Sequence, residues 1–287
     1  MNDDDPRPPF QGDAADGALL EKRVFGERVF QGVLLDVRRD RARLPDGHEA
    51  VREYIVHPGA VLVIPLRDDG RFIVERQFRY PHNRTFLEFP AGKIDPGESP
   101  LDTAMRELAE EDGYTAKQWT RLGVVHPGIS YSTEAIEIYA ARHLTHVGAK
   151  LDHGEFLDIV LSSREELLAA QDDDRLTDAK TVAALAMHDR WTSASQRSVI
   201  VRVLGSVHGV GYRDWMMRRA QQANVTGWVR NRRDATVEAL IQGSRDACDR
   251  LVDDCLRGPS AARVARVEVA RSDGSGTQGG FELRPSA

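Results

Sequence analysis

Three glutamates stand at helical spacing near residue 110. Glu107, Glu110 and Glu111 are three and four residues apart, so on a helix their carboxylates share one side. Three like charges this close destabilise a helix unless something neutralises them. A hard divalent cation does so with oxygen ligands, and Mg²⁺ is the usual one beside phosphates. The alternative is a solvated acidic helix face on which Arg106 pairs with Glu110.

The wider spacing favours the metal site. Five residues separate Gly92 from Glu98, and seven more lead to Arg106 and the glutamates, with Gly113 closing the pattern. This set resembles the Nudix box at its defining positions, which are Gly92, Glu98, Arg106, Glu107, Glu110, Glu111 and Gly113. The resemblance implies attack of water on one phosphorus of a diphosphate, with bound Mg²⁺, or Mn²⁺ in its place.

The same resemblance implies a role for each residue. Glu107 and Glu111 would be the main metal ligands, with Glu110 nearby and the backbone carbonyl of Ala91 joining them. Glu98 would support this metal shell. Arg106 would orient the glutamates without touching the metal.

Segments that flank the box indicate the substrate. Residues 75–80, 88–92, 126–132 and 148–156 resemble the ADP-ribose or ADP-sugar pyrophosphatase branch of the Nudix family. The resemblance spans about residues 21–190 and includes the β-rich start of the chain. It implies cleavage of a nucleoside diphosphate sugar such as ADP-ribose to AMP and a sugar phosphate. It also implies a homodimer in which N-terminal strands cross to the partner.

Three residues outside the box acquire roles by the same analogy. Arg79 would hold a phosphate or the terminal ribose, and the alternative is an exposed strand arginine. Glu88 would line the same substrate site. Glu155 would be the general base, and Asp152 lies close enough along the chain to be an alternative.

A second constellation lies near residue 210. Three glycines between Leu204 and Arg213 allow backbone N–H groups to surround an anion where a helix begins. Arg213 can add a forked, charge-assisted contact to phosphate. A glycine-rich loop is also an ordinary turn, so this signal alone is weak.

Segments 227–231, 234–238 and 280–284 strengthen that signal, because together with the loop they resemble acylphosphatase. The resemblance implies metal-free hydrolysis of a carboxyl–phosphate anhydride. Arg213 would bind the phosphate, and Asn231 would orient the attacking water. The developing charge would be stabilised by the loop backbone, at His208, Gly209, Val210, Gly211 and Tyr212. Two departures are His208, where Gln is usual, and Ala235, where Gly is frequent.

These residues need two scaffolds. The first half predicts strands at 30–37 and 50–56, and a buried hairpin of 60–66 with 71–78. A helix over 99–111 has a serine cap, a first-turn proline and a closing glycine. The remaining elements expected there are strands 119–125, 133–141 and 156–161 and helices 164–170 and 178–188. We expect a Nudix α/β/α sandwich with a β-rich N-terminal extension.

The second half predicts a strand, a helix, two strands, a helix and a strand. This βαββαβ order is the ferredoxin-like arrangement, so the chain combines α/β and α+β folds. The expected division is a loose tail over 1–20, a Nudix domain over 21–190, a linker over 191–197 and an acylphosphatase-like domain over 198–287.

Composition limits the other possibilities. The 287 residues carry a formal net charge of −6, which argues against general binding to nucleic acid or membranes. Cys248 and Cys255 are seven apart on one expected helix, too far for a disulfide, so we expect buried thiols in a reducing cytoplasm. Small-molecule partners are therefore expected, a nucleoside diphosphate sugar and an acyl phosphate.

Three hypotheses follow for the whole chain. The first is a bifunctional hydrolase with two independent sites. The second is one active hydrolase domain joined to a phosphate-binding or regulatory module. The third makes the Nudix domain a nucleotide sensor that acts on a partner, although a sensor need not keep a hydrolytic metal site.

Overall fold

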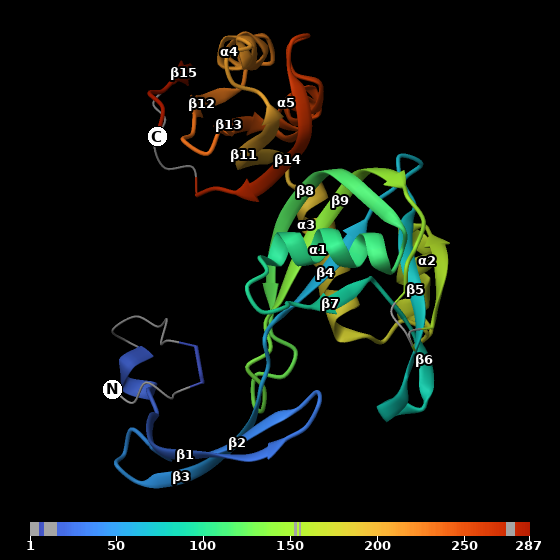
Figure 1. The fold of residues 1–287 in the computed structure, drawn as a ribbon, viewed down its shortest axis with the longest axis vertical. Helices are drawn as coiled ribbons and strands as arrows, with labels where there is room; N and C mark the ends of the chain where they lie inside the picture. Colours follow the sequence, from blue (N-terminus) through green and yellow to red (C-terminus); the bar gives the residue numbers. More distant parts are fainter. Residues whose placement is uncertain (1–5, 9–15, 152–153, 155, 274–278) are drawn as a thin grey trace.

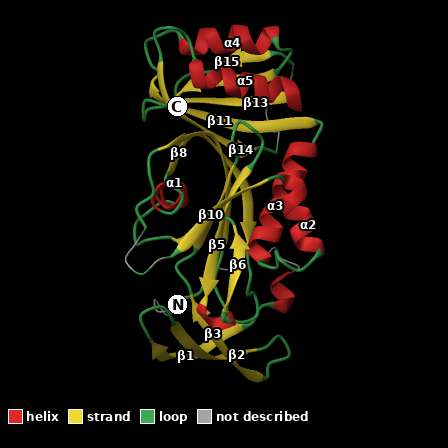
Figure 2. Ribbon diagram, turned by 90° about the vertical axis from the view of Figure 1, so that its right-hand side faces the viewer, coloured by secondary structure: helices red, strands yellow, loops and turns green. Residues whose placement is uncertain are grey.

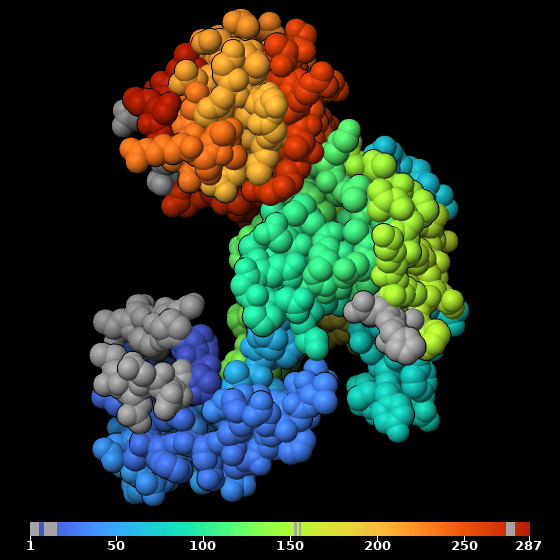
Figure 3. Space-filling view, in the orientation of Figure 1, coloured from blue at the N-terminus to red at the C-terminus, as the bar shows by residue number. Residues whose placement is uncertain are grey.

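The computed structural model arranges the chain in three parts. It describes residues 6–8, 16–151, 154, 156–273 and 279–287. An N-terminal sheet and a C-terminal domain form separate lobes on either side of a central domain (Figures 1 and 3). No helix in the described ranges is both long enough and apolar enough to cross a membrane.

The N-terminal sheet contains three antiparallel strands, β1 (Lys22–Gln31), β2 (Asp36–Arg43) and β3 (Glu49–Val56). The strand predicted over 30–37 is wrong, because the Gly32 amide donates to the Leu35 carbonyl and closes a hairpin there. The apolar residues 33–35 are exposed in this turn and resembled a strand only in composition. Within the expected loose tail, Asp16–Leu19 forms a short 3-10 helix, η1.

The central domain is built around two sheets. Strands β4 (Ala60–Pro65), β7 (Ala91–Lys93), β8 (Tyr114–Val125) and β9 (Ile136–His146) belong to a mixed sheet. Strands β5 (Phe72–Arg79), β6 (Arg84–Glu88) and β10 (Leu157–Ser162) form a second sheet, and η2 (Tyr80–His82) joins β5 to β6. Helix α1 (Pro100–Glu110) covers one face, while α2 (Arg164–Asp172) and α3 (Ala179–Ser193) lie on the other (Figure 2).

Strand β4 explains the sandwich. Its side chains alternate between two cores: Val61 and Val63 pack with Ala104 and Leu108 of α1, while Leu62 and its neighbours pack on the α3 side. A strand that is buried on both faces has a continuous apolar sequence. The expected α/β/α arrangement is confirmed.

The predicted hairpin of residues 60–66 and 71–78 is wrong. Strand β4 is paired on both edges, parallel to β9 and antiparallel to β7, so β5 cannot join it. Only an isolated bridge between Leu66 and Phe72 connects the two segments. The turn between them therefore passes from one sheet to the other.

The C-terminal domain has the predicted βαββαβ order. It consists of β11 (Gln196–Ser206), α4 (Tyr212–Gln222), β12 (Thr226–Asn231), β13 (Val237–Ser244), α5 (Arg245–Arg257) and β14 (Arg263–Arg271), followed by a short β15 (Phe281–Leu283). The sheet order β15-β12-β13-β11-β14 makes β11 and β13 central. Both cysteines of α5 are buried and free, as expected.

The two domains meet without an extended linker. Helix α3 continues to Ser193 and β11 begins at Gln196, so most of the predicted linker over 191–197 is regular. The reason is packing, because Trp191 contacts both domain cores and the Arg197 guanidinium lies 3.7 Å from the centre of its ring. Strand β14 also pairs in parallel with β8, which joins both domains in one nine-stranded sheet.

Candidate active sites

Helix α1 places the three box glutamates at the edge of the central core. Ser99 caps the helix by accepting from the Asp102 amide, as predicted. The apolar residues of α1 anchor one side in the core, which buries Glu107 to 9% exposure and Glu111 to 4%. Glu110 lies one turn along from Arg106 and is only half-buried. Buried carboxylates that stay ionised are stabilised by a cationic partner or a metal.

Arg106 connects these carboxylates. Its Nη1 atom donates to Glu107 and to Glu110 at 2.9 Å each, and its Nε and Nη2 atoms donate to Glu98 at 3.1 and 3.0 Å. The hydrogen bond from Arg106 holds the pKa of Glu98 below its usual value, and Thr103 adds a second hydrogen bond. Arg106 therefore fixes the orientation of the acidic side chains.

Gly92 has a steric role beside Glu107. A Cβ atom at this position would lie 1.8 Å from Glu107 Oε1, so any other residue would collide with the carboxylate. Strand β7 thus brings the backbone of Ala91 and Gly92 against the acidic face of α1. The donors gathered here are all oxygens, which suits Mg²⁺ or Mn²⁺.

The oxygen atoms of Ala91, Glu107, Glu110 and Glu111 suit such an ion in chemistry and position. Two of these residues, Glu107 and Glu110, are bound to Arg106 in this structure. Within the described ranges, no three acidic, histidine or cysteine side chains already converge to enclose a metal. The physical reason is that Glu107 and Glu110 are turned toward the Arg106 guanidinium. A metal would compete with this arginine for carboxylate oxygens.

A buried acidic pair behind α1 was not predicted from the sequence. Burial raises the pKa of Glu75 to about 10, and the nearby Glu111, Asp112 and Glu88 carboxylates add to the effect. Burial also raises the pKa of Asp112 to about 7. Both shifts favour the protonated forms of these two carboxyl groups. The proximity of Glu75 to Glu88 depends on the register between β5 and β6, in which the two residues face each other, and the sequence alone does not give that register.

Arg79 and Glu88 contact each other directly. Arg79 donates from Nε and Nη2 to the two Glu88 oxygens at 2.8 and 2.7 Å. Lys180 also pairs with Glu88, and it pairs with Asp178 at 2.8 Å. The sequence interpretation missed Lys180, which arrives from α3 and is far from the box in sequence. The proposed base Glu155 and its alternative Asp152 lie outside the described residues.

The glycine-rich loop of the C-terminal domain has the form of an anion site. Gly209 and Gly211 have φ values of +71° and +73°, and Gly211 precedes the first residue of α4. Within the described part of the chain, none of the amides of residues 208–211 donates to another group. Arg213, in the first turn of α4, is half-buried and makes no ion pair with a described residue. Free amides and an unpaired guanidinium at a helix start suit a phosphate.

The loop is tied to the rest of its domain at two points. His208 Nε2 donates to the Thr236 carbonyl at 2.9 Å, which links the loop to the β12–β13 turn. The Tyr212 hydroxyl donates to the Cys255 carbonyl at 2.6 Å, so its side chain faces the core and only its backbone can meet a ligand. Asn231 ends β12 opposite Val237.

The turn near Asn231 is strained at one residue. Ala235 has a φ of +63°, a left-handed conformation that favours glycine. The backbone strain expected from alanine in place of glycine is therefore observed at Ala235.

Comparison with known proteins identifies both domains. The NUDIX domain family matches residues 56–202, and the Acylphosphatase family matches residues 199–283. The chain belongs to the Nudix family. Its C-terminal part is an acylphosphatase domain, and both domains are hydrolases of acid anhydrides.

Relatives of the first domain include pyrophosphatases and an activator. An ADP-ribose pyrophosphatase of Bacillus subtilis is 37% identical over 58% of this chain and 92% of its own length. A methanol dehydrogenase activator of Bacillus methanolicus is 36% identical over 58% of this chain and 90% of its own. A solved ADP compounds hydrolase covers 60% of this chain and 93% of its own, with a TM-score of 0.55 and 28% identity.

The second domain has relatives of its own. An acylphosphatase of an Acidovorax species is 48% identical over 32% of this chain and 94% of its own length. This match supports the assignment of the C-terminal domain to the acylphosphatase family.

Proposed function

We propose that the chain is a bifunctional hydrolase with two independent sites. The central domain, about residues 21–190, cleaves ADP-ribose or a related nucleoside diphosphate sugar to AMP and a sugar phosphate, with Mg²⁺ or Mn²⁺. The C-terminal domain, about residues 198–287, hydrolyses an acyl phosphate without metal. The observation that carries the first activity is the close approach of Gly92 to Glu107, where a Cβ atom would lie 1.8 Å from the carboxylate, so that the backbone of β7 meets the buried glutamates directly.

In the central domain, Glu107 and Glu111 would hold the metal, with Glu110 and the Ala91 carbonyl beside them. The bound ion would supply charge stabilisation at phosphorus and a more acidic water. Arg106 and Glu98 keep the ligands in position. Arg79 would exchange part of its contact with Glu88 for a substrate phosphate, and Glu155 would accept the proton of the attacking water.

In the C-terminal domain, the phosphate would lie in the loop of residues 208–211. The unpaired amides would bind its oxygens, and Arg213 would bind two of them through its forked guanidinium. Asn231 would hold a water in line with the bond from phosphorus to the acyl oxygen. Its attack breaks that bond and releases a carboxylate and inorganic phosphate, while the loop amides stabilise the charge that develops.

We propose a homodimer through the N-terminal sheet. Several large apolar side chains of β1 and its hairpin are exposed there, at Phe25, Val29, Phe30, Val33 and Leu34. Exposed apolar patches of this kind mark interaction surfaces. We place the protein in the cytoplasm, where the buried thiols of Cys248 and Cys255 would remain reduced. Burial raises their pKa values to about 11 and 12.

The first experiment follows AMP release from ADP-ribose with Mg²⁺ and, separately, hydrolysis of an acyl phosphate in EDTA. We expect Glu111→Gln to lower only the first activity and Arg213→Ala only the second, each by at least about 100-fold. Matched controls are Glu165→Gln and Arg218→Ala, which change exposed residues of α2 and α4. Loss of both activities from either site variant would contradict independence.

A second candidate is supported by the methanol dehydrogenase activator among the relatives. In it, one domain is an enzyme and the other binds a phosphate ligand, or the Nudix domain acts as a nucleotide sensor. The discriminating result is calorimetric binding of ADP-ribose, or of phosphate at the loop, without turnover above that of the matching site variant.

A further inference from the structure

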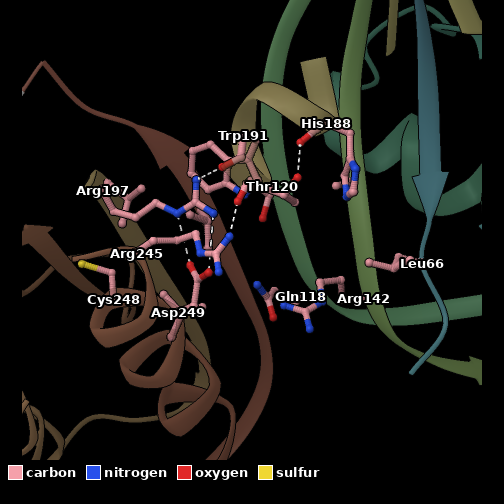
Figure 4. Close-up of a pocket in the computed structure, with 15 residues that line it drawn as sticks. Leu66, Gln118, Thr120, Arg142, His188, Trp191, Arg197, Arg245, Cys248 and Asp249 are labelled. Carbon is pink, nitrogen blue, oxygen red and sulfur yellow. Dashed lines mark hydrogen bonds and ion pairs between the residues drawn. The ribbon is translucent and has the colours of Figure 1, made fainter. Parts of the chain in front are cut away.

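A cavity of about 250 Å³ lies at the junction of the two domains. Its walls come from β8, β9 and α3 of the central domain and from β11, β14 and α5 of the C-terminal domain (Figure 4). It is separate from both proposed active sites, since no residue of the box, the glycine loop or Asn231 lines it. Its size is slightly below that of pockets for drug-sized ligands, so a small molecule would fill it.

The lining of the cavity is cationic although the whole chain carries a net charge of −6. Three arginines line it, Arg142, Arg197 and Arg245, against the single carboxylate of Asp249. Arg197 is almost fully buried and pairs with Asp249 at 3.2 Å, which leaves the other two charges without a carboxylate in the lining. A concentration of positive charge in a partly enclosed space favours an anion.

The hydrogen bonds of the arginines show which one is available. Arg245 donates to the Thr192 carbonyl and pairs with Asp246 at 3.0 Å. Arg142 comes from β9, is half-buried and has no ion-pair or hydrogen-bond partner among the described residues. An unpaired guanidinium has five N–H donors available for a ligand.

Two deeply buried polar atoms in the same lining also lack partners. Gln118 is 7% exposed, and its Oε1 atom accepts no hydrogen bond from any described residue. His188 is equally buried, and its Nδ1 atom is also without a partner there. Leaving such buried atoms unsatisfied destabilises the protein, so a ligand or water with matching groups is expected to lie against them. In Figure 4 the side chains of Gln118 and Arg142 lie next to each other.

We propose that this cavity binds a small phosphate monoester that carries hydroxyl groups. The phosphate meets Arg142 through its forked donors, because guanidinium geometry matches two phosphate oxygens. Arg245, whose nitrogens already donate to Thr192 and Asp246, adds its positive charge from the C-terminal domain. A ligand hydroxyl donates to Gln118 Oε1. Inorganic phosphate supplies only the first of these interactions, so the ester binds more tightly.

Binding there also joins the two domains. The Arg142 and Gln118 side chains belong to the central domain, whereas Arg245 belongs to α5 of the C-terminal domain. A ligand that contacts both domains binds the docked state more tightly than a separated one. It therefore raises the thermal stability of the full chain by mass action.

The test is calorimetric titration of the full chain with ribose 5-phosphate, inorganic phosphate and ribose, in EDTA. The protein carries Arg213→Gln throughout, which removes the phosphate contact of the glycine loop. We expect ribose 5-phosphate to bind at one site, more tightly than inorganic phosphate, and ribose to give no heat. Adding Arg142→Gln weakens binding at least about tenfold, whereas Arg250→Gln, an exposed change on α5, leaves it unchanged.

A second variant guards against an effect of Arg142→Gln on folding. Gln118→Met keeps the volume and removes the acceptor, so it should reduce the preference for ribose 5-phosphate over inorganic phosphate about fivefold. Absence of ribose 5-phosphate binding in the Arg213→Gln protein would overturn the proposal. Binding that neither Arg142→Gln nor Gln118→Met alters would overturn it as well.

Discussion

Single residues carry strain whose cost can be measured, and Ala235 is the clearest example. A φ of +63° destabilises the folded state by about 1–2 kcal/mol when the residue is alanine. Glycine removes this strain, but its greater conformational entropy in the unfolded chain lowers stability by about 0.4–1 kcal/mol. We expect Ala235→Gly to raise the unfolding free energy by about 0.5–1 kcal/mol, measured by urea denaturation. Ala194→Gly, at a φ of −63°, is the control and should destabilise. Equal effects of the two changes would exclude backbone strain as the cause.

His188 should make stability depend on pH. Burial against Phe72 lowers its pKa, and Arg142, Arg164 and Arg197 lower it further, with Asp189 opposing. The unfolded chain therefore binds the proton first, so stability is full above the unfolded pKa of about 6.5 and falls as pH drops below it.

The loss from His188 has a slope of up to about 1.4 kcal/mol per pH unit. Urea denaturation at pH 7.5 and 5.5 should show a smaller loss for His188→Gln than for the unchanged chain. His48→Gln, in an exposed turn, serves as the control and should keep the full loss. The idea fails if the two variants lose stability equally.

At the scale of the element, helix α1 links folding to metal binding. Ser99→Ala removes its cap and should cost about 1 kcal/mol. Helix α1 carries the glutamates, and it also positions Glu98 through the hydrogen bonds of Thr103 and Arg106. We expect Ser99→Ala to raise the Mg²⁺ concentration needed for half-maximal ADP-ribose cleavage.

Ser163→Ala provides a matched control for this prediction. Ser163 caps α2 in a complete capping box, so its loss should cost a similar free energy. Helix α2 carries none of the proposed ligands, so the Mg²⁺ requirement should not change. An equal shift in both variants would show that general destabilisation, not the position of α1, sets the metal requirement.

The elements also show what the sequence could predict. Helix α1 was predictable to within a residue or so at each end, because its cap, proline and glycine are local signals. The partners of β4 were not, since a fully apolar strand carries no information about which neighbour it joins. Residues brought together by distant elements, such as Lys180 with Glu88, were likewise invisible. The loop around Gly211 was predictable because its chemistry lies in one short segment.

At the scale of the molecule, the two hydrolase domains are parts of one structure. Strand β14 pairs with β8, so the sheet runs from one domain into the other. The ion pair of Arg197 with Asp249 and its stacking on Trp191 add side-chain contacts at the same junction. Fused domains with a small interface move independently by default, whereas this junction combines backbone pairing with a shared core residue. We therefore expect both domains to unfold together.

Trp191 tests that expectation because it packs against both cores. It is half-buried, so Trp191→Ala should cost about 2–3 kcal/mol, somewhat less than a fully buried tryptophan. It should also split a single calorimetric transition into two, because the two domains then separate before either domain core unfolds. Trp215→Ala removes a half-buried tryptophan that packs on the C-terminal core alone. That variant should unfold at a lower temperature but still in one transition. Two transitions in the unchanged chain would mean that the continuous sheet does not couple the domains.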